Sequence, residues 1–430
     1  MTRMIKNLCG LRFFKLYTGF SFGSFQNNPL QLILFCFGVL LTLSSNAQGT
    51  RLLRQPSISD THIAFIYGGD LWVSELGQTQ AVRITSTAAI ESDPHFSPDG
   101  QTIAFTSNRA GTPSVYTVSV NGGSVTRLTW HPSPVITRGW TPDGEHVLYA
   151  SSRDSAPIAF NRLWTVSVEG GAPRLLTAQW SHNGSFSPEG DQIVIDRMTR
   201  RDVEWRAYRG GQNTPLVILD LENESEIQLP HDSSIDIEPI WIGDNIYFLS
   251  DRDWTSNIWS YSIENETLSQ LTEFSDNDIK QLSGNDRLLT FEHNGFLYTL
   301  NPASNDINQL EINVSGDFPW AETKFENVSE SAESASLSPT GIRAIMAARG
   351  EVFTVPVENG DTRNITQSSG AADRAPIWSP LGDKIAWFSD NNGEYYQLML
   401  ANQDGRSELQ SISIGESLMA WSQPGLLMDN

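Results

Sequence analysis

A short turn motif recurs along this chain of 430 residues, and it constrains the possible folds more than any other feature. The clearest copies read FSPDG, WTPDG and FSPEG at residues 96–100, 140–144 and 186–190. Weaker copies follow at residues 241–244, 282–285, 337–341, 378–382 and 421–425. Proline presets the backbone of a tight turn and glycine accepts a positive φ, so each copy predicts a turn between two strands. A spacing of roughly 40 to 55 residues is typical of an array of similar sheets.

Each repeat contains four short strands. An alternating strand such as IAFT (103–106) follows the turn, and a polar turn comes next, SNR (107–109) or SDR (250–252). A third strand with a central aromatic residue leads through a glycine hairpin to a closing strand that ends in Arg-Leu-Thr or a similar triplet. Four short strands joined by hairpins form one blade of a β-propeller. A flat sandwich is the alternative, but it does not need the same turn and closing strand at one period. The sequence therefore predicts an all-β, WD40-like propeller.

The closing strands mark six repeats, and then the rhythm breaks. We predict a six-bladed β-propeller over residues 50–310 and an acidic, polar linker over residues 311–334. A second propeller is expected over residues 335–430, with two repeats and part of a third. Because a propeller needs at least four blades to close, we expect this second domain to be truncated.

Residues 1–47 have the pattern of a secretory signal peptide. Basic side chains without acidic ones precede an apolar stretch at residues 30–43, and small residues at Ser45 and Ala47 predict cleavage after Ala47. The apolar stretch is shorter than the roughly 20 residues of a membrane span, so stable membrane insertion is not expected after cleavage. An uncleaved anchor is the alternative. We expect a secreted or periplasmic product.

The chain is strongly acidic, with 50 Asp and Glu against 28 Lys and Arg and a formal net charge of −22. Such a surface repels phosphate backbones, which argues against nucleic acid as a partner. Both cysteines, Cys9 and Cys36, lie in the leader. The mature chain therefore has no disulfide, and its stability must come from the burial of a large core.

One segment carries a resemblance to a known family. The run WRAYRGG comprises Trp205, Arg206, Tyr208, Arg209, Gly210 and Gly211, and we place it between the first two strands of the fourth repeat. This run resembles a sequence of the six-bladed propeller of tricorn-type proteases. GDLW (69–72), IYFLSDR (246–252) and WFSDNNGEY (387–395) resemble the same family. TolB-like proteins and the propellers of prolyl oligopeptidase relatives share the blade repeats. The WRAYRGG run and the restart after six repeats favour tricorn.

The resemblance implies a function in proteolysis. In that family two propellers precede a PDZ domain and a serine-peptidase core, and they gate the passage of peptides to the active site. The catalytic groups belong to the core, so no residue of this chain inherits them and no catalytic residue is predicted. Adjacent arginines that anchor a substrate carboxylate in the family have no counterpart in the turn WHPSP (130–134). We expect peptides or a peptidase core domain as partners, and a homo-oligomer is a further expectation. Family members without a leader are cytoplasmic.

Two rival functions remain. The chain is either the peptide-recruiting part of a tricorn-like serine peptidase or a free-standing, TolB-like module that binds a protein partner. The only substrate-binding candidates are weak ones in a basic cluster, Arg200, Arg201, Arg206 and Arg209. These arginines either face the central channel, where they would attract peptide carboxylates, or pair with Asp202, Glu204 and neighbouring blades.

Other motifs carry little chemistry. The single Gly-x-Ser-x-Gly match, at residues 19–23, falls in the leader and lacks the strand–turn–helix context of a nucleophile elbow. The seven histidines are scattered, and no pair has the spacing of metal ligands. Asp-rich turns at residues 275–278 and 389–394 lack the spacing of a calcium loop and are interpreted as hydrogen-bonded turns. We therefore predict neither a metal nor a cofactor.

Overall fold

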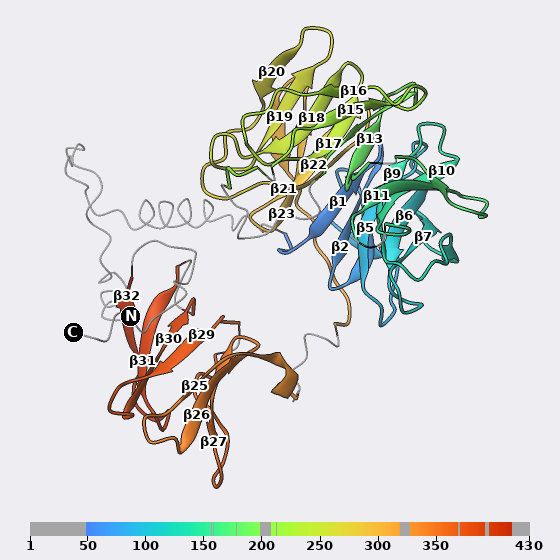
Figure 1. Ribbon diagram of the computed structural model, residues 1–430. Coiled ribbons are helices and arrows are strands. Elements are labelled where there is room, and N and C mark those ends of the chain that lie inside the picture. The colour runs from blue at the N-terminus through green and yellow to red at the C-terminus, as the bar shows by residue number, and fades with distance from the viewer. Residues whose placement is uncertain are drawn as a thin grey trace, which may run out of the picture. The chain divides into compact units, whose positions relative to one another are not determined.

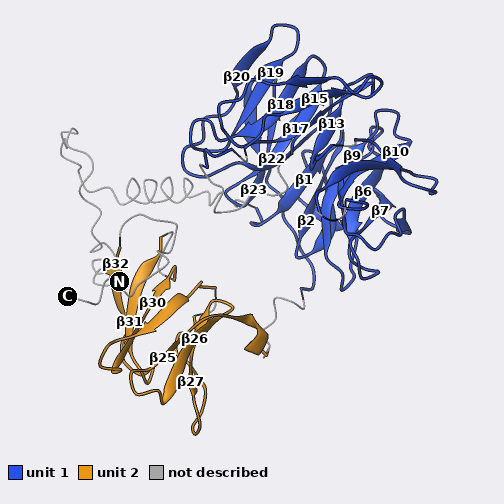
Figure 2. Cartoon of the chain, in the orientation of Figure 1, with its two compact units in different colours: residues 1–318 blue, residues 319–430 orange. Residues whose placement is uncertain are grey.

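The computed structural model describes residues 49–155, 157, 159–177, 179–197, 208–211, 213–318, 327–368, 370–391 and 395–414. The chain divides into two compact units, residues 1–318 and 319–430 (Figure 2). Within the described residues each unit is built from four-stranded antiparallel sheets, six in the first and two in the second (Figure 1). The predicted all-β fold is confirmed.

The strands of each sheet follow one another in chain order. The first three sheets comprise β1 (Arg54–Ile58), β2 (His62–Tyr67), β3 (Asp70–Glu75) and β4 (Ala81–Arg83); β5 (Glu91–Phe96), β6 (Thr102–Ser107), β7 (Ser114–Ser119) and β8 (Thr126–Arg127); and β9 (Val135–Trp140), β10 (His146–Ser151), β11 (Arg162–Ser167) and β12 (Arg174–Leu175). The next three comprise β13 (Gly184–Phe186), β14 (Gln192–Ile195), β15 (Val217–Asp220) and β16 (Glu226–Gln228); β17 (Asp236–Ile242), β18 (Asn245–Ser250), β19 (Asn257–Ser262) and β20 (Thr267–Gln270); and β21 (Lys280–Gly284), β22 (Leu289–His293), β23 (Phe296–Asn301) and β24 (Asp306–Gln309).

The second unit begins with a 3₁₀ turn. It comprises η3 (Ser329–Ser331), then β25 (Ala332–Leu337), β26 (Arg343–Ala348), β27 (Glu351–Pro356) and β28 (Arg363–Asn364), and finally β29 (Arg374–Trp378), β30 (Lys384–Ser389), β31 (Gln397–Asn402) and β32 (Gln410–Ser413). Strand β25 therefore starts three residues before the predicted boundary at 335. The two sheets pack on a core that includes Ile345, Val352, Trp378 and Trp387.

The six sheets of the first unit form a closed ring. Their first strands contact one another in the order β1, β5, β9, β13, β17 and β21, and β21 contacts β1 again. An apolar cluster fills each junction between neighbouring sheets. The junction between the sixth sheet and the first buries Phe65, Trp72 and Leu297. Because all six junctions are filled, the array has no open end, as a β-propeller requires.

Residues 312–314 belong to the ring, although the sequence analysis assigned them to a linker. Asn313 forms a parallel bridge with Gln80, and its N–H donates to Thr79 O at 2.6 Å. Ile312 is buried in the junction cluster beside β1, and its carbonyl accepts from Thr50 N at 2.7 Å. This segment covers the edge of β4, which would otherwise expose unpaired backbone groups. The polar sequence of this segment predicted a linker, and the pairing was missed because its partner, Gln80, lies in the first repeat.

The recurrent turn has the geometry that its sequence predicts. Gly100 adopts φ +69°, and its N–H donates to Ser97 O at 2.8 Å. The carboxylate of Asp99 accepts from Gln101 N at 3.0 Å and from the hydroxyl of Ser97. Gly144 repeats the conformation with φ +73°. Side-chain and backbone hydrogen bonds thus hold each turn locally, independently of the rest of the fold.

The aromatic residue before the turn joins neighbouring sheets. The indole of Trp140 donates to His95 O in the preceding sheet at 2.9 Å. In the second unit Trp378 donates in the same way to Ser336 O at 3.2 Å. The motif therefore combines a turn within one sheet with a hydrogen bond to the previous one.

The closing threonine also has a structural role. In five sheets its hydroxyl accepts a hydrogen bond from a backbone N–H of the third strand, 14 residues earlier. Thr129 accepts from Val115 N at 2.9 Å, and Thr272 accepts from Ile258 N at 2.8 Å. The closing strands are as short as two residues, so they leave this N–H without a strand partner. The hydroxyl supplies the missing acceptor.

We expect Thr129→Val to lower the free energy of unfolding by about 1–3 kcal/mol, because the nearly isosteric change leaves the buried N–H of Val115 unpaired. Denaturant unfolding followed by circular dichroism measures the difference. Thr126→Val, at an exposed position of strand β8 three residues earlier, is the matched control. Equal stabilities of the two variants would contradict the assigned role.

Candidate functional site

The first strands that line the propeller axis are interrupted by β-bulges. The register shifts between Arg54 and Ser57 in β1, and equivalent shifts occur in β5, β17 and β21. At each of these bulges one polar residue takes a positive φ of about 50°: Gln55 (52°), Asp93 (49°), Glu238 (55°) and Gln281 (54°). A bulge leaves an extra residue unpaired and re-aims its side chain. Here the four side chains line one pocket on the axis.

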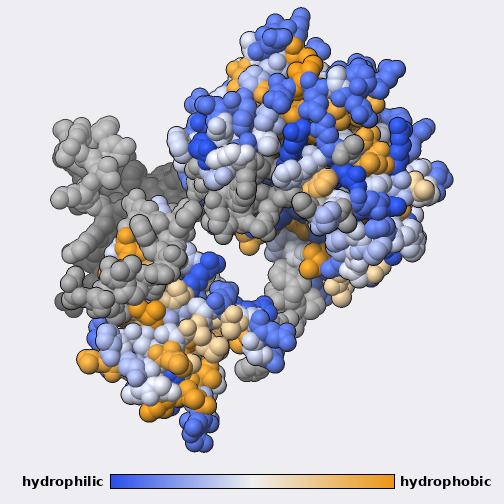
Figure 3. All heavy atoms as spheres, in the orientation of Figure 1, coloured by the Kyte–Doolittle hydropathy of each residue, from blue (hydrophilic) through white to orange (hydrophobic). Residues whose placement is uncertain are grey.

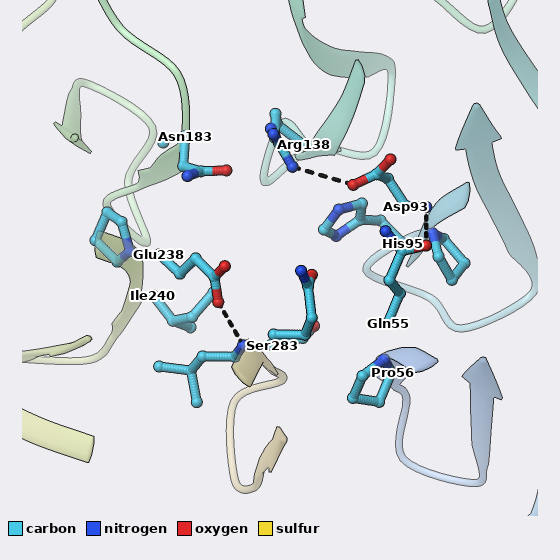
Figure 4. A pocket seen from close by; sticks show the side chains of 14 residues that line it. Gln55, Pro56, Asp93, His95, Arg138, Asn183, Glu238, Ile240 and Ser283 are labelled. Atoms are coloured by element: carbon cyan, nitrogen blue, oxygen red, sulfur yellow. Dashed lines mark hydrogen bonds and ion pairs between the residues drawn. The ribbon is translucent and has the colours of Figure 1, made fainter. Parts of the chain in front are cut away.

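The pocket draws residues from all six sheets. Its space, including the opening to solvent, is about 480 Å³. Charged and carboxamide side chains make up part of its wall, and Figure 4 shows five of them around one space: Gln55, Asp93, Arg138, Asn183 and Glu238. Apolar groups and prolines complete the wall, among them Pro56, Pro94, Pro239 and Ile240.

Side chains on the axis connect the first four sheets. The amide oxygen of Gln55 accepts from Asp93 N at 3.0 Å. The carboxylate of Asp93 accepts from Arg138 of the third sheet at 3.1 Å (Figure 4). Arg138 donates in turn to His182, at 3.1 Å to its carbonyl and at 2.7 Å to its Nε2. Each bond therefore runs from one sheet to the next.

The same pattern continues through the other junctions. Asp196 in the fourth sheet accepts from Glu238 N at 2.9 Å, and the carboxylate of Glu238 accepts from Leu282 N at 2.8 Å. Glu292 of the sixth sheet accepts from Gln55 N at 2.5 Å. The hydrogen bonds thus return to the first sheet and form a complete ring. The backbone N–H groups released by the bulges find their acceptors in the neighbouring sheet.

Burial shifts the pKa of two acidic side chains in the ring, Asp196 and Glu292. Burial raises the pKa of Asp196, although Asn183 and the N–H of Glu238 oppose it. Burial likewise raises the pKa of Glu292, against the N–H of Gln55 and the charge of Arg54. Donors from the first sheet therefore stabilise the charged form of Glu292, whereas the charged form of Asp196 is stabilised by Asn183 beside it as well as by Glu238 of the next sheet.

His182 accepts a hydrogen bond from Arg138, which fixes its tautomer. A guanidinium only donates, so Nε2 of His182 carries no proton. Burial, together with the positive charge of Arg138, lowers the pKa of His182 to about 2. The same two causes lower the pKa of His95, which also lines the pocket, to about 3. Both imidazoles are therefore neutral parts of the ring at physiological pH.

Two Asp–His pairs occur among the described residues, His231 with Asp236 and His293 with Asp276. His231 Nδ1 lies 3.1 Å from Asp236, but the hydroxyl of Ser234 donates to Asp236 rather than to the imidazole. Nε2 of His231 is buried without a hydrogen-bond partner. Burial raises the pKa of Asp236, but His231 and Arg252 outweigh it and hold the pKa below its usual value. His293 pairs with Asp276 at 3.2 Å. A serine hydrolase needs the hydroxyl on the histidine, so these pairs are structural.

Of the four candidate arginines, Arg209 alone lies within the described residues. It donates to the carboxylate of Asp251 at 3.0 Å and to the carbonyl of Asp251 at 2.7 Å, and its guanidinium lies 4.4 Å from the ring centre of Trp254. It therefore pairs with the neighbouring sheet and does not line the axial pocket. Arg200, Arg201, Arg206 and Trp205 lie outside the described residues.

The position of the WRAYRGG run needs a correction. Residues 205–211 follow β14 and precede β15, so they lie between the second and third strands of the fourth sheet, not between the first and second. The turn at residues 187–191, which resembles the others, already joins the first two strands. Within the run, a Cβ on Gly210 would collide with the ring of Tyr208, which explains the glycine. Gly211 has no such neighbour within 4 Å.

The sequence analysis did not identify the residues on the axis. One signal marks them: the bulge residue precedes a proline in Gln55-Pro56, Asp93-Pro94 and Glu238-Pro239. Proline inside a strand is confined to edges and bulges, so a polar residue followed by proline early in each repeat indicates this position. Gln281 lacks the proline and carries no such signal.

Among the described residues, one group of three side chains has its oxygen and nitrogen atoms close enough together to hold a metal ion. Asp143, Glu145 and His146 offer atoms within 4.8 Å of one another. They lie on an exposed hairpin turn, where Asp143 already accepts from Thr141 and from Glu145 N. The arrangement is that of the recurrent turn, so we assign it no ligand. Among the described residues, no helix has the length and hydropathy needed to cross a bilayer.

The closed ring of sheets and its polar axis define the first unit as a β-propeller. Residues 50–306 match the model of the tricorn protease N-terminal β-propeller domain. The chain therefore belongs to the tricorn protease family, as the sequence resemblance indicated.

Individual relatives agree with this assignment. Tricorn protease homolog 1 of Streptomyces coelicolor is 28% identical over 355 residues, which cover 80% of this chain and 32% of the relative. The tricorn protease homolog of Saccharolobus solfataricus is 25% identical over 361 residues, 82% of this chain and 32% of the relative. The crystal structure of the tricorn protease aligns with a TM-score of 0.57 at 20% identity, over 85% of this chain and 45% of that chain. The chain thus spans about a third of the curated relatives' length and corresponds to their propeller portion.

The neutral state of His182 has a consequence for stability. An unfolded histidine takes up a proton below about pH 6.5, whereas folded His182 resists protonation down to about pH 2. The unfolded state therefore binds more protons in this window, and the free energy of unfolding falls as the pH decreases, by up to about 1.4 kcal/mol per pH unit.

We expect His182→Gln to show a shallower fall in unfolding free energy between pH 6.5 and pH 4 than the parent chain. Urea unfolding at several pH values measures both slopes, and His62→Gln, at the partly exposed first position of strand β2, is the control. A slope identical to that of the parent would show that His182 is not held neutral by the ring.

Proposed function

We propose that this chain recruits unfolded peptides and controls their access to the catalytic core of a tricorn-like serine peptidase. The observation that carries the proposal is the family match together with a polar pocket on the axis of the ring. Peptide bonds are polar and common to all substrates, so carboxamide and charged side chains suit sequence-tolerant contacts. The core itself corresponds to the part of the relatives that this chain does not span.

The TolB-like alternative has less support. Both functions use a propeller, so the fold does not separate them. The family match and the two curated tricorn relatives favour the peptidase role. Peptides and a peptidase core are accordingly the proposed partners, and a homo-oligomer remains a part of the proposal that solution mass measurement would test.

Binding of an unfolded protein tests the recruitment role. The chain is expected to retain β-casein, which has little fixed structure, and to leave it intact during incubation. Folded ubiquitin is the matched probe and is expected not to bind. Surface plasmon resonance measures retention, and gel electrophoresis follows cleavage. Equal retention of the two probes would contradict peptide recruitment, and cleavage by the chain alone would contradict the assignment of catalysis to another domain.

We also propose that the chain is exported and processed after Ala47. The basic start, the apolar stretch and the small residues before Gln48 support this proposal. After expression in a bacterium with a general secretion pathway, N-terminal sequencing of the periplasmic fraction is expected to begin at Gln48. Intact protein that remains in the cytoplasm with Met1 present would contradict export.

A further inference from the structure

The two faces of the first unit differ in construction. Strands of each sheet alternate in direction, so the turns between first and second strands and between third and fourth strands share one face, the hairpin face. The connections into each first strand and between second and third strands share the opposite face, the loop face. The hairpin face comprises residues 59–61, 76–80, 97–101, 120–125, 141–145, 168–173, 187–191, 221–225, 243–244, 263–266, 285–288 and 302–305. The described residues of the loop face are 49–53, 68–69, 84–90, 108–113, 128–134, 152–155, 157, 159–161, 176–177, 179–183, 196–197, 208–211, 213–216, 229–235, 251–256, 271–279 and 294–295.

The hairpin face is almost uniformly acidic. It carries 13 exposed carboxylates: Asp60, Asp99, Asp143, Glu145, Glu169, Glu189, Asp191, Glu222, Glu224, Asp244, Glu264, Glu266 and Asp286. Its one basic residue, Arg287, is paired with Asp60 at 2.8 Å. No large hydrophobic residue is exposed in the described turns of this face. An anionic ligand is therefore repelled from this side.

The loop face has the opposite character. Its described loops contain eight acidic residues and six arginines, close to balance. All three exposed tryptophans of the described chain lie here: Trp130 (73% exposed), Trp180 (45%) and Trp254 (63%). Leu52 and Ile90 add exposed apolar surface on the same face. Hydrophobic residues are otherwise scattered over a mostly hydrophilic first unit in the view of Figure 3.

Arginines accompany the exposed indoles. The guanidinium of Arg127 lies 4.4 Å from the ring centre of Trp130, and that of Arg209 lies at the same distance from Trp254. Arg127 ends β8 and Arg162 begins β11, so both lie at strand ends that border the loop face. Arg127 donates to Thr129 O at 2.7 Å and to the hydroxyl of Ser114 at 2.9 Å, and Arg162 donates to the carbonyls of Arg153 and Asp154. Their partners among the described residues are neutral oxygens, so their positive charge is left for a ligand carboxylate.

A pocket lies beside Trp130. His131 and Pro132 of the same loop line it together with Tyr149 and Arg153, and Gly171 and Pro173 of the hairpin turn between β11 and β12 complete its wall. Its space, with its opening, is about 660 Å³. Arg127 lies over the indole that borders it, so an apolar side chain in the pocket would have a positive charge beside it. Trp, Tyr and Arg are the residues that most often dominate binding energy at interfaces.

We propose that the loop face receives the peptide, and that the Trp130 pocket binds an apolar side chain flanked by carboxylates. This inference rests on the proposed recruitment of peptides and adds the face and the preferred chemistry. The difference in charge determines which face binds. Acidic segments of a peptide are repelled by the hairpin face and meet Arg127 and Arg162 at the border of the loop face. The indole and the tyrosine then supply contact for an aromatic or aliphatic side chain.

Two capped peptides test this preference. One alternates Asp and Phe over six residues and the other alternates Lys and Phe, and both ends are blocked so that no terminal charge contributes. The acidic peptide is expected to bind at least about tenfold tighter, to weaken with added salt and to change the emission of the exposed tryptophans. Isothermal titration calorimetry gives the affinities, and fluorescence reports the site.

Variants locate the site. Trp130→Ala is expected to weaken the acidic peptide by about tenfold or more, and Trp130→Phe to retain most of the affinity. Ile227→Ala, which removes an exposed apolar side chain from outer strand β16, is the control and is expected to bind like the parent. Trp130 is largely exposed, so its loss leaves the core intact; circular dichroism checks this.

The outcomes separate the two proposals. If the chain retains β-casein but prefers the lysine peptide, or if Trp130→Ala binds the acidic peptide like the parent, the loop-face inference is wrong and recruitment stands. If neither β-casein nor either peptide binds, the recruitment function itself fails and the inference fails with it.

Discussion

The first unit depends on the satisfaction of backbone N–H groups at its axis. Bulges in the first strands remove ladder partners from these groups, and side chains of the adjacent sheet replace them. The acceptors Gln55, Asp196, Glu238 and Glu292 therefore connect sheets rather than strands. Because the bonds return to the starting sheet, we expect the loss of the hydrogen bonds at one junction to weaken the alignment of the other sheets as well. The apolar clusters between sheets supply most of the burial, and the axial bonds specify how the sheets are aligned.

This division explains what the sequence could predict. Turns such as that at Gly100 and closing residues such as Thr129 act within one sheet, over at most 14 residues, so each repeat displays them. Their period predicted an all-β propeller, and the WRAYRGG run together with the restart after six repeats indicated the family. The role of residues 312–314 could not be predicted, because their partner Gln80 lies in the first repeat and only ring closure brings the two together.

The candidate site was less accessible to sequence reasoning for the same reason. Gln55 and Glu292 are 237 residues apart, and although Pro56 marks Gln55 as a bulge residue, nothing local marks Glu292 as its partner. The arginine cluster attracted attention because it is basic in an acidic chain, yet Arg209 pairs with Asp251 and covers Trp254. The sequence shows a tryptophan at position 130, but not that its side chain is exposed and borders a pocket. Both properties depend on the conformation of the loop between the second and third sheets. The proposed recruitment of peptides gives these surfaces a common role, and charge distinguishes the two faces.

Hydrogen exchange at the axis tests the closed ring most directly. The account predicts that the amides of Gln55, Asp93, Glu238 and Leu282 exchange slowly and with one common opening free energy, because each is hydrogen-bonded to a neighbouring sheet and the ring opens as a unit. Mass spectrometry of short peptic fragments in the full chain resolves these strands. Exchange at β1 as fast as in the exposed hairpin turns, with slow exchange at the other junctions, would contradict a closed ring.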